Sequence, residues 1–283
     1  MDTATGAARL ARMITVTALN IYPVKSCKGI ALEQALIADT GFARDREWLI
    51  ARPDGQFITQ RQEPRLALIT TALTDDALIL SAPEIGTLTI PLAVHGDPVE
   101  VTCWRDKCAA FDTGAEAAAW LEAHLGKPHR LVKFDPSRRR SSSREWTRDV
   151  EAITQFADGF AFLAISQASL DDLNGRLARP LPMNRFRPNL VIDGLPPFGE
   201  DDVHEFTGEG IRLRIVKPCT RCAITTTDQT TGQRDGDEPL RTLRSYRFSR
   251  ELKGVMFGQN VILIEGAGRR LQVGQQLEAT LKA

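Results

Sequence analysis

The sequence contains no long apolar run. No stretch reaches the roughly 18 consecutive apolar residues that a membrane-spanning helix requires. The first thirteen residues, MDTATGAARLARM, also lack the apolar segment of a secretory signal peptide. These two absences predict a cytoplasmic protein with a short frayed start and no membrane partner.

The sequence also has no excess of charge of either sign. Its 283 residues include 36 Lys and Arg and 36 Asp and Glu, so the formal net charge is zero. A neutral chain has no overall field that attracts nucleic acid, and we expect no specific nucleic-acid binding. Hydrophobic residues make up 42% of the chain, which is enough for one large or two medium domains with their own cores.

Cysteine is scarce and odd in number. An odd set in a chain without an export signal argues against a disulfide framework and predicts free thiols. Cys103 and Cys108 supply only the first spacing of a plant-type ferredoxin motif, so we expect no iron–sulfur cluster in this chain. The histidines show no spacing typical of zinc ligands. The residues concerned are Cys27, Cys103, Cys108, Cys219 and Cys222, and His95, His124, His129 and His204.

The first half of the chain consists of short apolar runs separated by turn residues. From Ile14 to about Ile90 these runs have strand length, and RPDGQ (52–56) places Asp-Gly where a hairpin turn belongs, which predicts an antiparallel β unit. A helix is predicted over 112–128, capped by Asp112 or Thr113. Residues 135–149 are polar and basic and are predicted to form a loop or linker.

The second half alternates predicted strands with two short helices. Ser166 is expected to cap a helix over 167–177, and Asp237 one over 237–247. The expected strands are FAFLAIS (160–166), NLVIDG (189–194), IRLRIVKP (211–218), CAITTTD (222–228) and NVILIEG (260–266). Many short strands with few helices predict a mainly β protein of barrel type, with units at 14–134 and 150–281.

The segment PCTRCAITTTD (218–228) is the strongest chemical signal. A Cys-x-x-Cys pair is used as half of a zinc site, as a thiol–disulfide pair, or as one thiolate that binds a soft metal beside a packing neighbour. Two inert buried cysteines are a further reading. The predicted strand after Cys222 argues against a thioredoxin-like pair, which precedes a helix, whereas Lys217 and Arg221 favour a thiolate.

Seven segments in order resemble one known family. They are YPVKSCKG (22–29), RDREW (44–48), QRQEPRLALI (60–69), NRFRPNLVI (184–192), PCTRCAITTTD (218–228), EPLRTLRSYR (238–247) and FGQN (257–260). Together they resemble the MOSC family, and within it the mitochondrial amidoxime-reducing components and the bacterial N-hydroxylaminopurine-reducing relatives. The resemblance covers about residues 14–281 and implies a MOSC N-terminal β-barrel domain (14–134), a basic linker (135–149) and a MOSC β-barrel domain with short helices (150–281).

The resemblance also implies an activity and a metal-binding site. It implies an oxidoreductase with a molybdenum cofactor, a molybdopterin dithiolene that carries a phosphate. The implied substrates are N-hydroxylated compounds: amidoximes, hydroxylamines and N-hydroxylated bases. By position in the motif, Cys222 is the catalytic molybdenum ligand, and Cys219 is a spectator.

Ten further residues are implied to bind the cofactor. A phosphate dianion favours Arg forks and Lys point charges, which fits several of them. They are Lys25, Ser26, Arg46, Asp158, Arg187, Asn189, Thr220, Arg221, Gln259 and Asn260. The sequence departs from the family at Gly159 and Phe160, where the animal relatives have small hydroxyl side chains, so hydrogen bonds to the cofactor from these positions are in doubt.

Electrons are expected from another protein. Longer bacterial relatives carry a C-terminal ferredoxin domain, whereas this chain ends in LQVGQQLEATLKA (271–283), predicted as the last barrel strand. We expect a separate flavin or iron–sulfur reductase, docked on the loop with Arg138, Arg139 and Arg140 or on a stripe of Arg241, Arg244 and Arg247. Two alternatives remain: a non-catalytic carrier of the cofactor or of sulfur on Cys222, and a thiol oxidoreductase that needs both cysteines.

Overall fold

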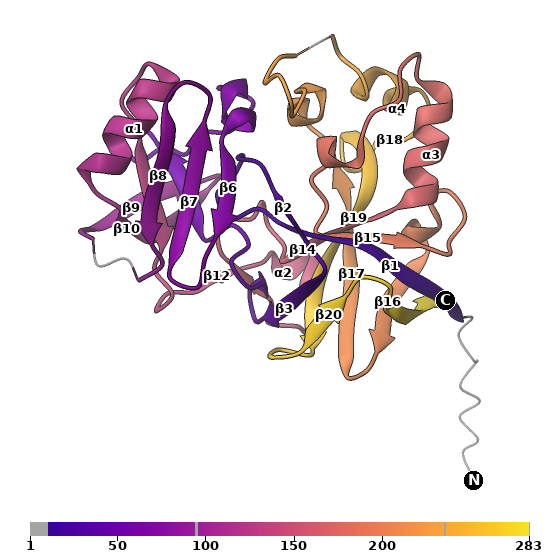
Figure 1. Ribbon diagram of the computed structural model, residues 1–283. Coiled ribbons are helices and arrows are strands. Elements are labelled where there is room, and N and C mark those ends of the chain that lie inside the picture. Colours follow the sequence, from indigo (N-terminus) through magenta and orange to yellow (C-terminus); the bar gives the residue numbers. More distant parts are fainter. Residues whose placement is uncertain (1–10, 94–95, 235, 283) are drawn as a thin grey trace.

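The computed structural model describes residues 11–93, 96–234 and 236–282. Residues 1–10 of the expected frayed start and His95 lie outside these ranges, whereas residues 11–13 already belong to a strand. The described chain is mainly β with a few short helices, which confirms the predicted fold class (Figure 1). No helix in the described ranges is long and apolar enough to cross a bilayer.

A closed barrel of seven strands forms the right-hand part of Figure 1. Each strand pairs with the next, and the first and last, β14 and β19, also pair and close the ring. The order is β14 (Phe162–Ser166), β15 (Leu190–Asp193), β1 (Ala11–Ile21), β21 (Gln276–Leu281), β16 (Val203–Gly208), β17 (Ile211–Thr220) and β19 (Gly254–Glu265). The final segment is therefore a barrel strand, as predicted.

The first strand does not join the N-terminal sheets. β1 pairs antiparallel with β15 and β21, and its buried residues Ile14 and Val16 pack in one core with Phe206 and Leu213. In Figure 1 it is the indigo strand among orange and yellow ones. In space the run from Ile14 therefore joins the second barrel, because its apolar face completes that ring. The division at 135–149 stays a prediction.

Two antiparallel sheets form the left-hand part of Figure 1. One has the order β5 (Trp48–Ala51), β11 (Arg130–Phe134), β10 (Asp106–Asp112) and β9 (Pro98–Cys103), and the other β6 (Thr70–Leu73), β7 (Ala77–Ala82) and β8 (Gly86–Pro91). Helix α1 (Ala115–Leu125) lies inside the range predicted as a helix, 112–128, and buries Ala117, Leu121 and Leu125 against them.

Short elements connect these parts. The strands are β2 (Ile30–Leu32), β3 (Gln34–Ala38), β4 (Gly41–Phe42), β12 (Arg140–Ser141), β13 (Ile153–Thr154), β18 (Phe248–Ser249) and β20 (Arg270–Gln272). The helices are α2 (Arg144–Thr147), α3 (Gln167–Arg176), α4 (Leu240–Tyr246) and the 3-10 turns η1 (Pro64–Leu68), η2 (Met183–Arg185), η3 (Gly199–Asp201) and η4 (Ala223–Thr226). The predicted linker thus carries β12 and α2.

The predicted helix caps are only partly confirmed. Ser166 is the N-cap of α3, although its side chain makes no capping hydrogen bond. Gly114 caps α1 in place of Asp112 or Thr113: the Asp112 carboxylate accepts from the Gly114 amide, and the Thr113 hydroxyl donates to Leu131. Pro239, rather than Asp237, is the N-cap of α4.

The prediction of a strand over CAITTTD (222–228) is wrong. β17 ends at Thr220, and Cys222 is the N-cap of the 3-10 turn η4. The hydroxyls of Thr225 and Thr226 donate to the carbonyl oxygens three residues earlier, at 3.0 and 2.8 Å. These local bonds offer the backbone a turn and override the β propensity of a β-branched run. The argument from a following strand against a dithiol pair therefore does not hold.

Candidate active site

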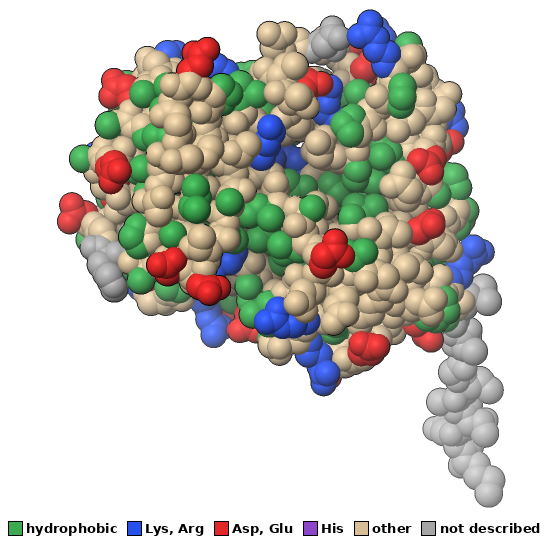
Figure 2. Space-filling view, viewed as in Figure 1, with side chains coloured by type: hydrophobic (Ala, Val, Ile, Leu, Met, Phe, Trp, Pro, Cys, Tyr) green, Lys and Arg blue, Asp and Glu red, His purple; other side chains and the backbone are tan. Residues whose placement is uncertain are grey.

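A pocket of ≈440 Å³ lies between the two parts of the molecule. Figure 2 shows Lys and Arg side chains inside a hollow between the left-hand and right-hand parts. Of the residues assigned to the site from the sequence, Lys25, Ser26, Arg46, Asp158, Arg187, Asn189, Thr220, Arg221, Cys222 and Asn260 line this pocket. Residues from both halves of the chain thus converge on one cavity.

Gln259 is the exception. Its side chain is fully buried, and Nε2 donates a hydrogen bond of 2.6 Å to Asp201 Oδ1 in η3. Successive residues of a strand point to opposite faces, so Asn260 lines the pocket while its neighbour Gln259 points away from it. Asn260 Nδ2 donates to the carbonyl of Lys217, which joins β19 to the strand that leads to the cysteines.

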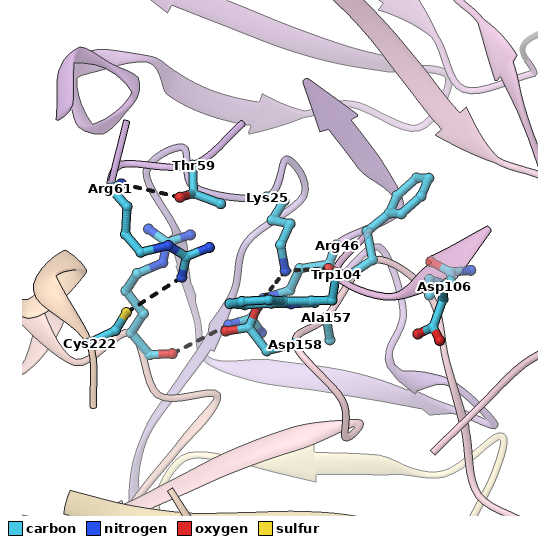
Figure 3. A network of polar contacts seen from close by, with 12 residues as sticks. Lys25, Arg46, Thr59, Arg61, Trp104, Asp106, Ala157, Asp158 and Cys222 are labelled. Atoms are coloured by element: carbon cyan, nitrogen blue, oxygen red, sulfur yellow. Dashed lines mark hydrogen bonds and ion pairs between the residues drawn. The ribbon is translucent and has the colours of Figure 1, made fainter. Parts of the chain in front are cut away.

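Cys222 lies half-buried at the pocket wall. The segment that carries it is fixed by the Arg221 amide, which donates to Val255 O in β19 at 2.8 Å. Arg61, from the N-terminal part, donates from Nη1 to Cys222 Sγ at 3.6 Å (Figure 3). The sulfur is therefore accessible and faces a cation, in contrast to an inert core cysteine.

Cys219 has its own arginine. Arg221 Nη1 donates to Cys219 Sγ at 2.9 Å, and Arg221 Nη2 to Phe186 O at 2.6 Å. Burial raises the pKa of Cys219, and the Arg221 charge offsets only part of that rise. Both cysteines line the pocket, so its lining alone does not distinguish ligand from spectator.

Lys25 and Asp158 form an ion pair at the pocket wall. Lys25 is buried, and its Nζ lies 2.5 Å from Asp158 Oδ1 and 2.7 Å from Phe156 O. Enclosure raises the pKa of Asp158, but the charge and hydrogen bond of Lys25 outweigh it and hold that pKa well below its usual range. The Asp158 side chain is 70% exposed, so an ionised carboxylate faces the pocket.

Two arginines stack on one tyrosine. The guanidinium carbons of Arg46 and Arg187 lie 4.4 and 4.2 Å from the ring centre of Tyr22. Arg46 pairs with Asp45 at 2.5 Å and donates to Asn189 Oδ1 at 2.8 Å. These contacts connect β1, the turn after β4 and the loop before β15, and they fix both arginines at the pocket.

Arg187 has no carboxylate partner among the described residues. Its Nη1 donates to Cys27 O at 2.6 Å, and its side chain is buried. Burial therefore lowers the pKa of Arg187 to about 10, with the nearby Arg46 charge acting in the same direction. A buried guanidinium without a counter-charge is a ready partner for an anion.

The charge of the pocket is strongly one-sided. One lining residue is acidic, Asp158, and seven are basic: Lys25, Arg46, Arg61, Arg187, Lys217, Arg221 and Lys253. Arg221 Nε is buried with no hydrogen-bond partner in the described chain. The chain as a whole has no net charge, but this pocket is basic and is suited to an anionic group.

Backbone strain concentrates at the same place. Ser26, Arg46 and Arg187 have φ values of 70°, 50° and 56°, in the left-handed region that non-glycine residues rarely adopt. Such conformations persist where the surrounding structure enforces them, and they are frequent at functional sites.

Several lining residues were not predicted. Thr59, Arg61, Trp104 and Lys253 line the pocket without having been singled out, and Lys217, expected only as a cation near the cysteine pair, lines it too. Arg61 lies inside one of the seven family segments, which was the available signal, whereas Trp104 sits in a turn with no motif around it. No group of three or more His, Cys, Asp or Glu side chains that could hold a metal ion is found within the described ranges.

The two expected docking surfaces need correction. Arg140 is buried. Its Nε pairs with Asp106 at 2.8 Å, and its Nη1 donates a hydrogen bond to Ala157 O at 2.6 Å. These two contacts fix the segment that leads to Asp158. In the α4 stripe, Arg247 pairs with Asp201 at 2.5 Å. The exposed members that remain are Arg138, Arg139, Arg241 and Arg244. Of these, Arg139 is paired with Glu151 and Arg241 with Glu238.

Two families match this chain. The MOSC N-terminal beta barrel domain matches residues 13–128, and the MOSC domain matches residues 152–278. Mitochondrial amidoxime-reducing component 1 of Mus musculus is 38% identical over 263 residues, which cover 89% of this chain and 76% of the relative. The human protein of that name is 37% identical, covering 88% and 78%, and mitochondrial amidoxime reducing component 2 of Bos taurus is 37% identical, covering 84% and 74%.

Proposed function

Because this chain belongs to the MOSC family, with its N-terminal barrel domain ahead of the MOSC domain, we propose that it is a molybdenum cofactor-dependent oxidoreductase that reduces N-hydroxylated compounds. The reaction breaks the N–O bond, consumes two electrons and two protons, and releases water and the N–H compound. The observation that carries the proposal is the convergence of a half-buried thiol, Cys222, with seven cations on one cavity.

The pocket residues fit the cofactor. Arg187, which is buried and has no carboxylate partner in the part of the chain that the structure describes, would hold the phosphate with Arg46, Lys25 and Ser26. Arg221 Nε, which has no partner in the described chain, and Asn189 would bind the pterin edge. Cys222 would supply the thiolate ligand that soft metals prefer. When bound, the cofactor supplies the two-electron chemistry, and the protein holds and orients it.

Asp158 has a defined task in this proposal. Because Lys25 keeps its pKa low, Asp158 stays ionised near neutral pH and accepts hydrogen bonds. An amidoxime or an N-hydroxylated base presents N–H donors beside its N–O bond, and the exposed carboxylate would orient them. Asp158 therefore binds and positions the substrate, while Lys25 prevents its protonation.

The electrons would come from a separate flavin or iron–sulfur protein. Arg138 and Arg139 are exposed and would attract an acidic donor. We place the enzyme in the cytoplasm because all five cysteines are free thiols, as is typical of reducing compartments. The matched relatives are named as mitochondrial proteins, so the compartment is a part of the proposal to be tested.

Metal analysis and turnover test the proposal together. Protein made in a cofactor-competent cell is expected to contain about one molybdenum per chain and to reduce benzamidoxime with a chemical reductant. Cys222→Ser should lose both metal and turnover, whereas Cys219→Ser should keep its metal. Bound metal without turnover would instead indicate a cofactor carrier, and equal loss of activity in both variants with no metal in the wild type would indicate a thiol oxidoreductase.

A further inference from the structure

Trp104 occupies a turn position that disfavours it. β9 and β10 form a hairpin in which Cys103 pairs with Asp106, so Trp104 and Arg105 are the two turn residues. Trp104 has a φ of 61°, a left-handed value at a position where hairpin turns prefer glycine. A bulky side chain at such a φ is unfavourable, and its presence calls for a role outside folding.

The indole is held at the pocket while much of it stays exposed. Trp104 lines the cavity with 43% of its surface exposed, an uncommon state for a large apolar residue. Its Nε1 donates to Asp158 Oδ1 at 3.1 Å, and the Arg61 guanidinium lies 4.4 Å from the ring centre. Figure 3 shows the indole beside Lys25 and Asp158. Phe57 leans against it at 5.3 Å.

These contacts fix the ring without covering it. The Arg61 guanidinium stacks on the face of the Trp104 ring and donates a hydrogen bond to the sulfur of Cys222. The Asp158 carboxylate accepts hydrogen bonds from the indole and from Lys25. Trp104 therefore stands between the side chains that we assign to the metal and to the substrate. Phe160, two residues after Asp158, lines the same pocket. A second aromatic side chain thus lines the cavity that holds the indole.

We propose that Trp104, with Phe160, forms an aromatic-ring subsite that selects planar substrates, an inference that rests on the proposed N-hydroxy reductase function. A flat aromatic or heteroaromatic ring stacks on the exposed part of the indole, while the amidine N–H groups of the same molecule donate to Asp158. An aliphatic hydroxylamine has no ring to stack. The subsite therefore lowers KM for aromatic amidoximes and N-hydroxylated bases and leaves KM for small aliphatic hydroxylamines unchanged.

The test compares two substrates in four variants of the cofactor-loaded protein. Trp104→Gly and Trp104→Leu remove the ring, Trp104→Phe keeps a ring but loses the bond to Asp158, and Phe248→Ala removes an exposed aromatic side chain outside the pocket. For Trp104→Gly and Trp104→Leu, KM for benzamidoxime should rise about tenfold, with kcat and the KM for N-methylhydroxylamine within about twofold. Trp104→Phe and Phe248→Ala should keep nearly the wild-type KM ratio.

Affinity and stability supply readouts independent of turnover. Benzamidine, the unreactive product of benzamidoxime, should bind the ring-less variants about tenfold more weakly than the wild type by calorimetry. Trp104→Gly should melt no lower than the wild type, because glycine removes the strain at this turn. Glu84→Gly, at a turn residue with a φ of 66° outside the pocket, is the matched control and should gain stability without any change in KM.

The possible failures are distinguishable. A wild-type enzyme that reduces no N-hydroxylated compound refutes the proposed function, and the benzamidine affinities still decide on the subsite. Equal KM changes for both substrates, or unchanged benzamidine affinity in Trp104→Gly and Trp104→Leu, would overturn the subsite. A Trp104→Gly variant that melts several degrees lower would show that the tryptophan serves folding instead.

Discussion

Arg61 donates a hydrogen bond to the sulfur of Cys222, a residue 161 positions later in the chain. The donor lies in the loop between β5 and η1, and the acceptor follows the end of β17, so this bond joins the two parts of the molecule across the pocket. Arg234 holds the donor segment in place through hydrogen bonds to the carbonyls of Gln60 and Arg61, at 2.6 and 2.8 Å. The site therefore exists only when both parts are folded and docked.

Removing this cation should lower the molybdenum content. Arg61→Leu leaves Cys222 without its hydrogen-bond donor, and a charge-assisted hydrogen bond contributes about 1.5–3 kcal/mol. We expect purified Arg61→Leu to hold less than half the wild-type molybdenum, and Arg61→Lys to retain more than Arg61→Leu. Arg52→Leu, an exposed arginine outside the pocket, is the control. Full metal occupancy in Arg61→Leu at wild-type turnover would show that the contact is incidental.

The sequence was sufficient for the local chemistry at this site. Runs such as FAFLAIS and NLVIDG favour a strand by length and composition, and residues 162–166 and 190–193 form one in each. Lys25, Arg187 and Cys222 stand in segments of a recognisable family pattern, and they meet in one pocket. Residue type and spacing determine the strands, because these depend on near neighbours in the chain. The site residues were instead assigned through the family resemblance.

What the sequence could not reveal depends on contacts between distant segments. β1 joins the second barrel because its apolar face completes that ring, and no local pattern says which sheet a strand will enter. Arg140 looks like a solvated loop residue, yet Asp106 and the carbonyl of Ala157 bury it. The segment after Cys222 forms a turn although its threonines have a high β propensity, because their hydroxyls donate hydrogen bonds to carbonyl oxygens three residues earlier.

The Lys25–Asp158 pair should stabilise the fold in a pH-dependent way. Its charge and hydrogen bond lower the pKa of Asp158, so the contribution is fully present above the unfolded pKa of about 3.9 and is lost as the pH falls below that value. Asp158→Asn keeps an acceptor for Trp104 but removes the charge. Wild type should therefore melt above Asp158→Asn by a constant margin from pH 8 to pH 5, and the margin should shrink between pH 4 and pH 3. The margin should go on shrinking below pH 3, because the folded pKa of Asp158 lies well below the unfolded one. A margin that is as large at pH 3 as at pH 5 would contradict the assignment.

The uncompensated charge of Arg187 should make the cofactor-free protein respond to phosphate. Inorganic phosphate that binds the folded state stabilises it by about 2.7 kcal/mol at a concentration of 100 times its Kd. Thermal melts should therefore shift upward with added phosphate in the wild type and much less in Arg187→Met. Without phosphate, Arg187→Met should be as stable as the wild type or more stable, because it no longer buries an unpaired guanidinium. Equal phosphate shifts in both proteins would place the anion elsewhere.

The exposed loop arginines should control the supply of electrons but not the chemistry. Arg138 and Arg139 are exposed on the loop that β12 and Arg140 anchor to the rest of the molecule, and a charge pair across a docking surface chiefly raises the association rate. Reversing both, as Arg138→Glu with Arg139→Glu, should slow turnover with an acidic donor protein about tenfold at low salt and flatten its salt dependence, since the Debye length falls to about 3 Å at 1 M. Turnover with a small chemical reductant should stay unchanged. Arg244→Glu, on the exposed face of α4, is the matched control. If that single change slows donor-driven turnover and the double reversal does not, the donor docks on α4 instead.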